Sequence, residues 1–114
     1  MRGYFITGTD TDAGKTAVTA SLGKHMGPHL HDRLMLIKPV QTGCLKQPDG
    51  SWLAPDEAVY AGLGCRGKAL FRYEPPCSPH LAASLAGDTL SVAALAEAVR
   101  GAVPEGDAVL VEGA

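Results

Sequence analysis

The sequence predicts an α/β fold in which a parallel sheet is flanked by helices in three layers. Short, mainly apolar runs at residues 4–7, 34–37 and 108–111 have the length and composition of buried strands. Long segments with helix signals separate these runs, as crossovers between parallel strands require. The chain of 114 residues is long enough for one small domain and not for two.

Signals at the ends of the intervening segments locate the helices. Four helices are expected, at about residues 15–25, 55–63, 79–86 and 92–103. Pro55 and Pro79 fit the first helical position, and Ser78 and Ser91 are suited to cap the last two helices. Apolar residues at helical spacing predict a buried stripe on the first helix and another on the last: Val18, Leu22 and Met26, and Val92, Leu95, Val99 and Val103.

The remaining segments carry loop and charge signals. Turn formers dominate residues 43–54, which we expect to be a loop, and Pro39 is expected to end the second strand. The basic side chains between the second and third helices, Arg66, Lys68 and Arg72, are expected to form a solvent-exposed group.

The segment between the first strand and the first helix has the pattern of a phosphate-binding loop. Residues 8–16 read Gly-Thr-Asp-Thr-Asp-Ala-Gly-Lys-Thr and directly follow the first strand. The glycines allow successive N–H groups to face one anion, and the positive end of the helix dipole adds to the attraction. Lys15 supplies a cation for the outer phosphates, and the Thr16 hydroxyl suits Mg²⁺. The predicted fold is therefore P-loop NTPase-like.

The loop departs from the common phosphate-loop pattern by one residue. That pattern has four residues between its first glycine and Gly-Lys-Thr, whereas Gly8 and Gly14 enclose five here. The extra residue assigns the loop to a longer subtype and makes the motif more diagnostic.

Polar residues also stand at the edge of the sheet where parallel sheets bind ligands. Lys38 and Thr42 lie in Ile-Lys-Pro-Val-Gln-Thr-Gly after the second strand, where a lysine, a hydroxyl and a glycine suit an anion. Glu112 ends the third strand, as an Mg²⁺ ligand or a water-orienting group does in P-loop proteins. Asp56, in the first turn of a helix, is either a helix-start residue or a metal ligand.

Four segments together resemble the dethiobiotin synthetase family. They are Gly-Thr-Asp-Thr-Asp-Ala-Gly-Lys-Thr, Lys-Pro-Val-Gln-Thr-Gly, Ser-Pro-His and Val-Glu-Gly-Ala, in the family's order and at family-like spacing. The family's chains are much longer. The resemblance therefore implies that residues 1–114 are a single P-loop domain, incomplete at the C-terminus, with a truncated sheet.

The resemblance implies a role for each matching residue. The nucleotide site would comprise Asp12, Ala13, Gly14, Lys15, Thr16, Ala17, Asp56, Glu112 and Gly113. The Mg²⁺ ligands among them would be Thr16, Asp56 and Glu112. Lys38 corresponds to the family's active-site lysine and would act with Lys15 in catalysis, while Thr42 and Thr11 would contact the substrate.

The implied reaction carboxylates 7,8-diaminononanoate with CO₂ and closes a ureido ring in biotin synthesis. A carbamate would attack the γ-phosphate of ATP, and the second amine would close the ring on the resulting carbamic-phosphoric anhydride to give dethiobiotin. Lys15, Lys38 and Mg²⁺ would offset the repulsion between the two anions. For the 114-residue chain itself we expect weak phosphate binding and very low turnover.

Other functions share the phosphate loop. One is a switch-type or non-catalytic P-loop ATPase fragment that acts through partners, but residues 9–13 contain no lysine of the kind that such switches carry. Another is a cobalamin-pathway amidotransferase domain, against which the Lys-Pro-Val-Gln-Thr-Gly segment counts. A folded remnant without activity is the last. Diamine-dependent ATP hydrolysis would separate these alternatives.

The composition limits the classes of partner and the cellular locations that we expect for this chain. A net charge of −2 without a basic stripe, and aromatic residues at 5%, argue against nucleic acid. The sequence has no apolar run of about 18 residues, so a membrane span is not expected. The N-terminus leads directly into a strand, which favours the cytoplasm. The three cysteines are expected to be reduced, structural thiols. The family resemblance implies a homodimer at full length.

Overall fold

A computed structural model describes residues 2–7, 14–30 and 33–113. Within these ranges, four parallel strands form one sheet in the order β1-β6-β2-β5. They are β1 (Arg2–Ile6), β2 (Leu34–Gln41), β5 (Gly67–Arg72) and β6 (Ala108–Glu112). Because β6 and β2 are central and parallel, the polar residues at their carboxyl ends share one edge of the sheet.

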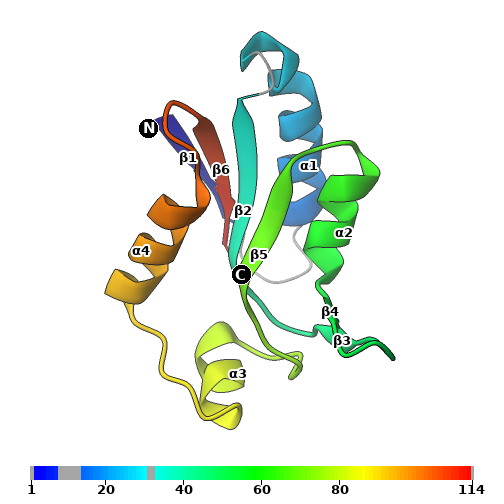
Figure 1. Ribbon diagram of the computed structural model, residues 1–114, viewed down its shortest axis with the longest axis vertical. Helices are drawn as coiled ribbons and strands as arrows, with labels where there is room; N and C mark the ends of the chain where they lie inside the picture. The colour runs from blue at the N-terminus through cyan, green and yellow to red at the C-terminus, as the bar shows by residue number, and fades with distance from the viewer. Residues whose placement is uncertain (1, 8–13, 31–32, 114) are drawn as a thin grey trace.

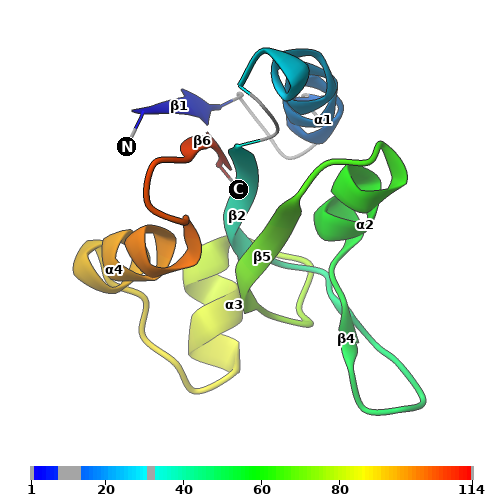
Figure 2. The same ribbon diagram turned by 45° about the horizontal axis from the view of Figure 1, so that its top comes forward.

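Helices cover both faces of this sheet, which confirms the predicted three-layer α/β fold (Figure 1 and Figure 2). They are α1 (Lys15–Met26), α2 (Pro55–Gly62), α3 (Pro79–Leu85) and α4 (Val92–Ala102), with a 3₁₀ turn η1 (Pro28–Leu30) after α1. None of the helices in the described ranges combines the length and apolarity that a membrane crossing requires.

Alternate residues of β2 build the core on its two sides. Leu36 packs with Ala20 of α1 and Tyr60 of α2 on one face. Ile37 packs with Val99 of α4 on the other. This alternation follows from the period of two along a strand, and it explains why β2 is apolar on both faces.

Pro39 does not end β2, contrary to the expectation from sequence. The amide of Leu36 donates to the carbonyl of Arg66 at 2.8 Å, so the even-numbered amides of β2 face β5. Position 39 therefore faces the β6 side, where the pairing ends at Ile37 and Val111. Since the missing N–H of proline interrupts no ladder bond there, the strand continues to Gln41.

The strand β5 is missing from the sequence prediction, which assigned its basic residues to a solvent-exposed group. Only Ala69 of this strand is fully buried, because β5 is the last strand on its side of the described sheet. A strand at this position lacks the continuous apolar run that marks a central strand. Arg72 also pairs with Glu57 of α2 at 2.6 Å, so it is tied to a neighbouring helix.

The segment 43–54 contains a short antiparallel hairpin rather than a loop alone. Its strands are β3 (Leu45–Lys46) and β4 (Trp52–Leu53). Gly50, in the turn between them, has a φ of 88°, a left-handed conformation that glycine adopts without strain. Gly50 is therefore a turn residue, as predicted. The expectation of a loop throughout is wrong, because the residues on either side of the turn pair as strands.

The predicted starts of α3 and α4 are confirmed by their caps. The hydroxyl of Ser78 accepts a hydrogen bond from the amide of Leu81 at 3.4 Å, and that of Ser91 accepts one from Ala94 at 3.1 Å. Each bond satisfies an amide that has no intrahelical acceptor.

The predicted buried stripes are partly wrong. Val92 is 86% exposed and Val18 is also exposed. Leu22 and Met26 of the predicted α1 stripe are partly buried against the core, and the small residues Ala20 and Gly23 are fully buried beside them. A Cβ atom on Gly23 would lie 2.8 Å from Leu36 Cδ1, so the helix approaches the sheet more closely than a leucine-based stripe would allow.

Candidate functional site

A pocket of about 220 Å³ lies at the carboxyl end of β2. Its polar lining comes from Lys15 and Thr16 at the start of α1, from Lys38, Gln41 and Thr42 at the end of β2, and from Asp56 at the start of α2. Apolar side chains complete the wall: Val40, Pro76 and Pro79. Two helix N-termini and a strand end thus surround one hollow, the usual place for a ligand in an open parallel sheet.

The start of α1 is suited to bind an anion. Gly14 has a φ of 79°, and no side chain of the described residues caps this helix. First-turn amides of a helix have no intrahelical acceptor and carry the positive end of the dipole. Lys15 is buried in the same turn and lines the pocket, which adds a positive charge beside these amides.

Glu112 is a buried carboxylate held by three donors. It is only 1% exposed. Its Oε2 accepts hydrogen bonds from Thr16 Oγ1 at 2.7 Å and from Lys38 Nζ at 3.0 Å, and its Oε1 accepts one from the Tyr60 hydroxyl at 2.6 Å. These bonds replace the water that a carboxylate loses on burial.

Lys38 links the two carboxylates of the site. Its Nζ lies 2.7 Å from Asp56 Oδ2 and 3.0 Å from Glu112 Oε2, and it donates to the Gly113 carbonyl at 3.0 Å. An ammonium has three N–H donors, and these three contacts account for them. Lys38 is therefore fixed as a buried cation between two acids.

Gln41 positions the start of α2, a role that the sequence analysis misses. Ala54 precedes this helix and has no side chain to cap it. Gln41 Oε1 instead accepts the Asp56 amide at 3.2 Å, while Gln41 Nε2 donates to the Thr42 carbonyl at 2.8 Å. The amide side chain thus ties the end of β2 to the helix that carries Asp56. Its place beside Thr42 is the only sequence signal for it.

Tyr60 is the other site residue that the sequence analysis misses. Burial first, and its hydrogen bond to Glu112 second, raise the pKa of Tyr60, so the hydroxyl remains a donor. A sequence signal does exist, because Tyr60 follows Asp56 by four residues and shares a helix face with it.

The structure brings together most of the residues that the resemblance implies. Those that line the pocket are Lys15, Thr16, Lys38, Thr42 and Asp56, and those that adjoin it through Lys38 are Glu112 and Gly113. Gly14 and Ala17 are exposed beside the first turn of α1. Thr11, Asp12 and Ala13 lie outside the described residues.

The oxygen donors of the cluster fit a magnesium ion. A hydroxyl from Thr16 and carboxylates from Asp56 and Glu112 are the hard ligands that Mg²⁺ prefers, together with phosphate oxygens. Both carboxylates already face one cation, since each lies within 3.0 Å of Lys38 Nζ. A metal ion would share these carboxylates with the ammonium group.

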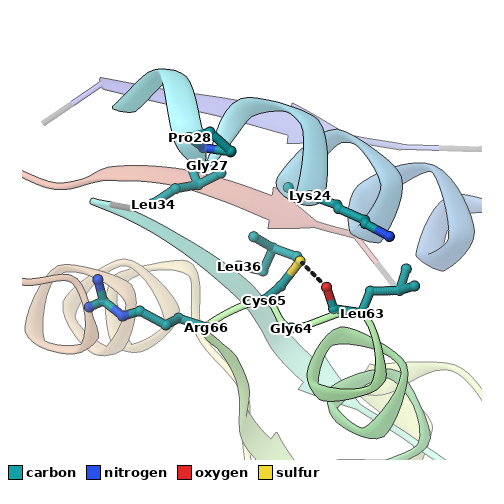
Figure 3. Close-up of a pocket in the computed structure, with 10 residues that line it drawn as sticks. Lys24, Gly27, Pro28, Leu34, Leu36, Leu63, Gly64, Cys65 and Arg66 are labelled. Carbon is teal, nitrogen blue, oxygen red and sulfur yellow. Dashed lines mark hydrogen bonds between the residues drawn. The ribbon is translucent and has the colours of Figure 1, made fainter. Parts of the chain in front are cut away.

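A second hollow, of about 400 Å³, lies at the other end of the sheet (Figure 3). It is bounded by the end of α1, by the start of β2 at Leu34 and by the segment after α2. Its Cys65 thiol donates to the Leu63 carbonyl at 4.0 Å, and burial raises the pKa of this thiol. Arg66 on its rim pairs with Asp107 at 3.2 Å. Because open parallel sheets bind ligands at the carboxyl ends of their strands, we assign the functional site to the smaller pocket.

The fold and the site together define a P-loop nucleotide-binding domain of the α/β class. An AAA domain family matches residues 2–114, and the chain belongs to this family.

Similarity to individual curated proteins confirms the resemblance to the dethiobiotin synthetase family that the motifs indicate. The chain is 40% identical to "ATP-dependent dethiobiotin synthetase BioD" of Anoxybacillus flavithermus and 36% identical to the protein of the same name from Aeromonas hydrophila, over 100% of this chain and 52% of each relative. It is 41% identical to that of Corynebacterium efficiens over 96% of this chain and 48% of the relative. The chain spans about half the length of the curated relatives it matches.

Proposed function

We propose that this chain carries the ATP-phosphate site of a dethiobiotin synthetase, which carboxylates 7,8-diaminononanoate and closes its ureido ring. The observation that carries the proposal is the convergence of two lysines, a hydroxyl and two carboxylates at one edge of the sheet: Lys15, Lys38, Thr16, Asp56 and Glu112. The names of the relatives support the same assignment.

In this proposal the loop before α1 wraps the phosphates of ATP. Asp12 and Ala13 would do so with Gly14 to Ala17, while Asp56, Glu112 and Gly113 would border the nucleotide. Mg²⁺ held by Thr16, Asp56 and Glu112 would neutralise charge on the outer phosphates when it is bound. Thr11 and Thr42 would contact the diamine.

The proposed reaction has three steps. One amine nitrogen attacks CO₂ and loses a proton, which gives a carbamate. A carbamate oxygen then attacks the γ-phosphorus, and the bond to the β–γ bridging oxygen breaks so that ADP leaves. The second amine attacks the carbonyl carbon of the anhydride and loses a proton, and phosphate leaves with the bonding pair as the ring closes.

The lysines would act mainly in the second step, when one anion approaches another. Charged groups held in a buried site stabilise the developing charge more than the same groups do in water. All three donors of Lys38 are occupied here, so an incoming carbamate or phosphate oxygen would replace one of its present acceptors. Phosphoryl transfer depends largely on positioning and electrostatics, so the proposal requires no covalent protein nucleophile.

The test combines binding with product analysis. The 114-residue chain is incubated with Mg²⁺, ATP, the diamine and ¹³C-bicarbonate, and labelled dethiobiotin and released phosphate are measured with and without the diamine. We expect weak calorimetric uptake of Mg·ATP and slow, diamine-dependent phosphate release accompanied by labelled product. Hydrolysis that ignores the diamine, or no uptake of Mg·ATP by folded protein, would contradict the proposal.

The proposal also includes the binding partners, the oligomeric state and the cellular location of the enzyme. Its partners are the small molecules ATP, diamine and CO₂, and the net charge of −2 gives no support to nucleic acid as a partner. A single P-loop domain, a homodimeric assembly and a cytoplasmic location without membrane contact belong to the same proposal. Sedimentation and fractionation of the expressed protein test them.

A further inference from the structure

Tyr60 is a buried neighbour of Glu112 that lies outside the four segments resembling the synthetase family. Its side chain is 0% exposed and packs with Leu36 and Leu110 in the core beneath α1 and α2. Among the described contacts its hydroxyl makes one hydrogen bond, which it donates to Glu112 Oε1 at 2.6 Å.

The neighbouring backbone fixes the position of the Tyr60 ring. A Cβ atom at Gly67, the first residue of β5, would lie 2.7 Å from Tyr60 Cδ2 and 2.9 Å from the Leu36 carbonyl oxygen. Glycine at this position therefore leaves room for the ring. A ring held by the core and by a strand holds its hydroxyl in one place.

The two oxygens of Glu112 have separate partners. Oε1 is bound by Tyr60, whereas Oε2 is bound by Thr16 and Lys38, both of which line the pocket. The two oxygens of a carboxylate are equivalent, so a half-turn restores the same contacts, whereas a partial rotation breaks the bond to the fixed hydroxyl. Tyr60 thus fixes the plane of the carboxylate and occupies the oxygen that faces away from the pocket.

We propose that Tyr60 is a positioning residue that fixes the plane of the Glu112 carboxylate, so that one of its oxygens is directed at the phosphate and magnesium site. The inference rests on the proposed function, since that function supplies the metal and the nucleotide. A phenylalanine would fill the core equally well but would leave Oε1 without this donor. Partners of metal-binding carboxylates act in this way, and their removal typically weakens metal binding by about 10–100-fold.

The first experiment measures metal affinity in the full 114-residue chain. Mn²⁺ replaces Mg²⁺ as an electron paramagnetic resonance probe at saturating ATP. In Tyr60→Phe we expect Mn²⁺ binding to weaken about 10–100-fold, with the metal-free affinity for ATP unchanged. Tyr73→Phe is the matched control, because Tyr73 is a buried tyrosine in a different cluster and its loss should leave Mn²⁺ binding as it was. Wild-type Mn²⁺ affinity in Tyr60→Phe would overturn the inference.

The second experiment needs no ligand and separates this inference from the proposed function. The side-chain carboxyl carbon of Glu112 is followed by ¹³C NMR and assigned with Glu112→Gln. We expect its resonance to shift in Tyr60→Phe and to stay in place in Tyr73→Phe. If the wild-type chain took up no Mn·ATP, the proposed function would fail, and an unmoved Glu112 resonance would still overturn the positioning role.

A third measurement covers the case in which Tyr60→Phe does not fold. The chain has three tyrosines, so the Cζ resonance of Tyr60 can be assigned by removing the other two in Tyr4→Phe and Tyr73→Phe. In Glu112→Gln this resonance should shift, because the charged acceptor of the hydroxyl is lost. An unchanged Tyr60 resonance would overturn the inference.

Discussion

Lys38 sets the charge balance of the site at the level of single residues. It is buried, and it lies within 3.0 Å of a carboxylate on each of two elements, Asp56 of α2 and Glu112 of β6. Two carboxylates this close to a common point, one buried and one partly exposed, repel each other unless a cation lies between them. The ammonium group therefore has a structural role in the free protein and, in the proposed function, a catalytic one.

Lys38→Met should reveal both roles. Breaking a buried ion pair by removing one partner lowers the free energy of unfolding by about 3–5 kcal/mol. Loss of a preorganised charge lowers the rate of phosphoryl transfer by roughly 10²–10³. Urea unfolding and diamine-dependent phosphate release measure the two effects. Lys24→Met, at an exposed position on α1, is the control and should change neither. An unfolding midpoint equal to that of the wild type would contradict the buried pairing.

Buried titratable groups predict how stability depends on alkaline pH. Burial is the largest cause that raises the pKa of the Cys44 thiol above its ordinary 9.0 and that of the Tyr60 hydroxyl above its ordinary 10.0. As the pH rises through these ordinary values, the unfolded chain loses the protons first and becomes relatively more stable. The contribution of these groups to folding is therefore complete below about pH 9 and falls above it.

Urea unfolding between neutral pH and about pH 10.5 measures this dependence. The urea concentration at the unfolding midpoint should be constant up to the ordinary pKa of a thiol and should decrease at higher pH. Cys44→Ala should make the decrease shallower, whereas Cys77→Ala, at a partly buried thiol, serves as the control. A wild-type midpoint that stayed level throughout would refute the assignment.

The sequence indicates the charged residues of the site better than the residues that hold them. Lys15 and Glu112 belong to motifs whose spacing reflects the chemistry of phosphate and metal. Gln41 and Tyr60 act through partners that folding brings near, such as Glu112, which is 52 residues from Tyr60 along the chain. A tyrosine on an apolar helix face fits a core residue equally well, so only the folded position of its hydroxyl distinguishes the roles.

At the level of elements, the helices and the strands β1, β2 and β6 are predictable from the sequence, and β5 is not. β2 and β6 carry continuous apolar runs because both of their faces are covered. β5 has a neighbouring strand on one side only in the described sheet, and it carries Lys68 and Arg72. Its sequence pattern therefore resembles that of a charged loop. The extension of β2 past Pro39 is also not predictable from the sequence, because it depends on which neighbouring strand the proline nitrogen faces.

The contact between α2 and β5 can be tested with a pair of glycines. A Cβ atom on Gly67 would lie 2.9 Å from the backbone oxygen of Leu36, which cannot move freely, and 2.7 Å from the Tyr60 ring. Gly67→Ala should therefore lower the free energy of unfolding by about 1–3 kcal/mol and displace the Tyr60 Cζ resonance.

Gly62→Ala, at the end of α2, is the matched control for this contact. Nothing lies within 4 Å of a Cβ atom there, so the alanine should be neutral or should stabilise the helix by at most about 1 kcal/mol. Equal unfolding midpoints for the two variants would show that β5 does not approach α2 and β2 as closely as described.

At the level of the whole molecule, polar and apolar surfaces are separated. The proposed chemistry occupies the carboxyl end of the sheet, whereas an almost wholly apolar groove of about 500 Å³ runs between β1 and α4. Tyr4 is 59% exposed and Phe5 is 64% exposed on the strand side of this groove, and Val92 is exposed on the helix side. β1 is also the last strand on its side of the described sheet, so its outer backbone groups have no strand partner within the described residues.

This surface predicts that the chain associates as its concentration rises. Exposed apolar patches and unpaired strand edges both favour contact between molecules. In sedimentation velocity experiments the average mass of the wild-type chain should increase with concentration. The double variant Tyr4→Lys with Val92→Lys should remain closer to the monomer mass, because two charges then face the groove. Leu45→Lys changes an exposed apolar residue on the hairpin instead and should leave the association unchanged. If Leu45→Lys abolished association and the double variant did not, the hairpin and not the groove would be the contacting surface.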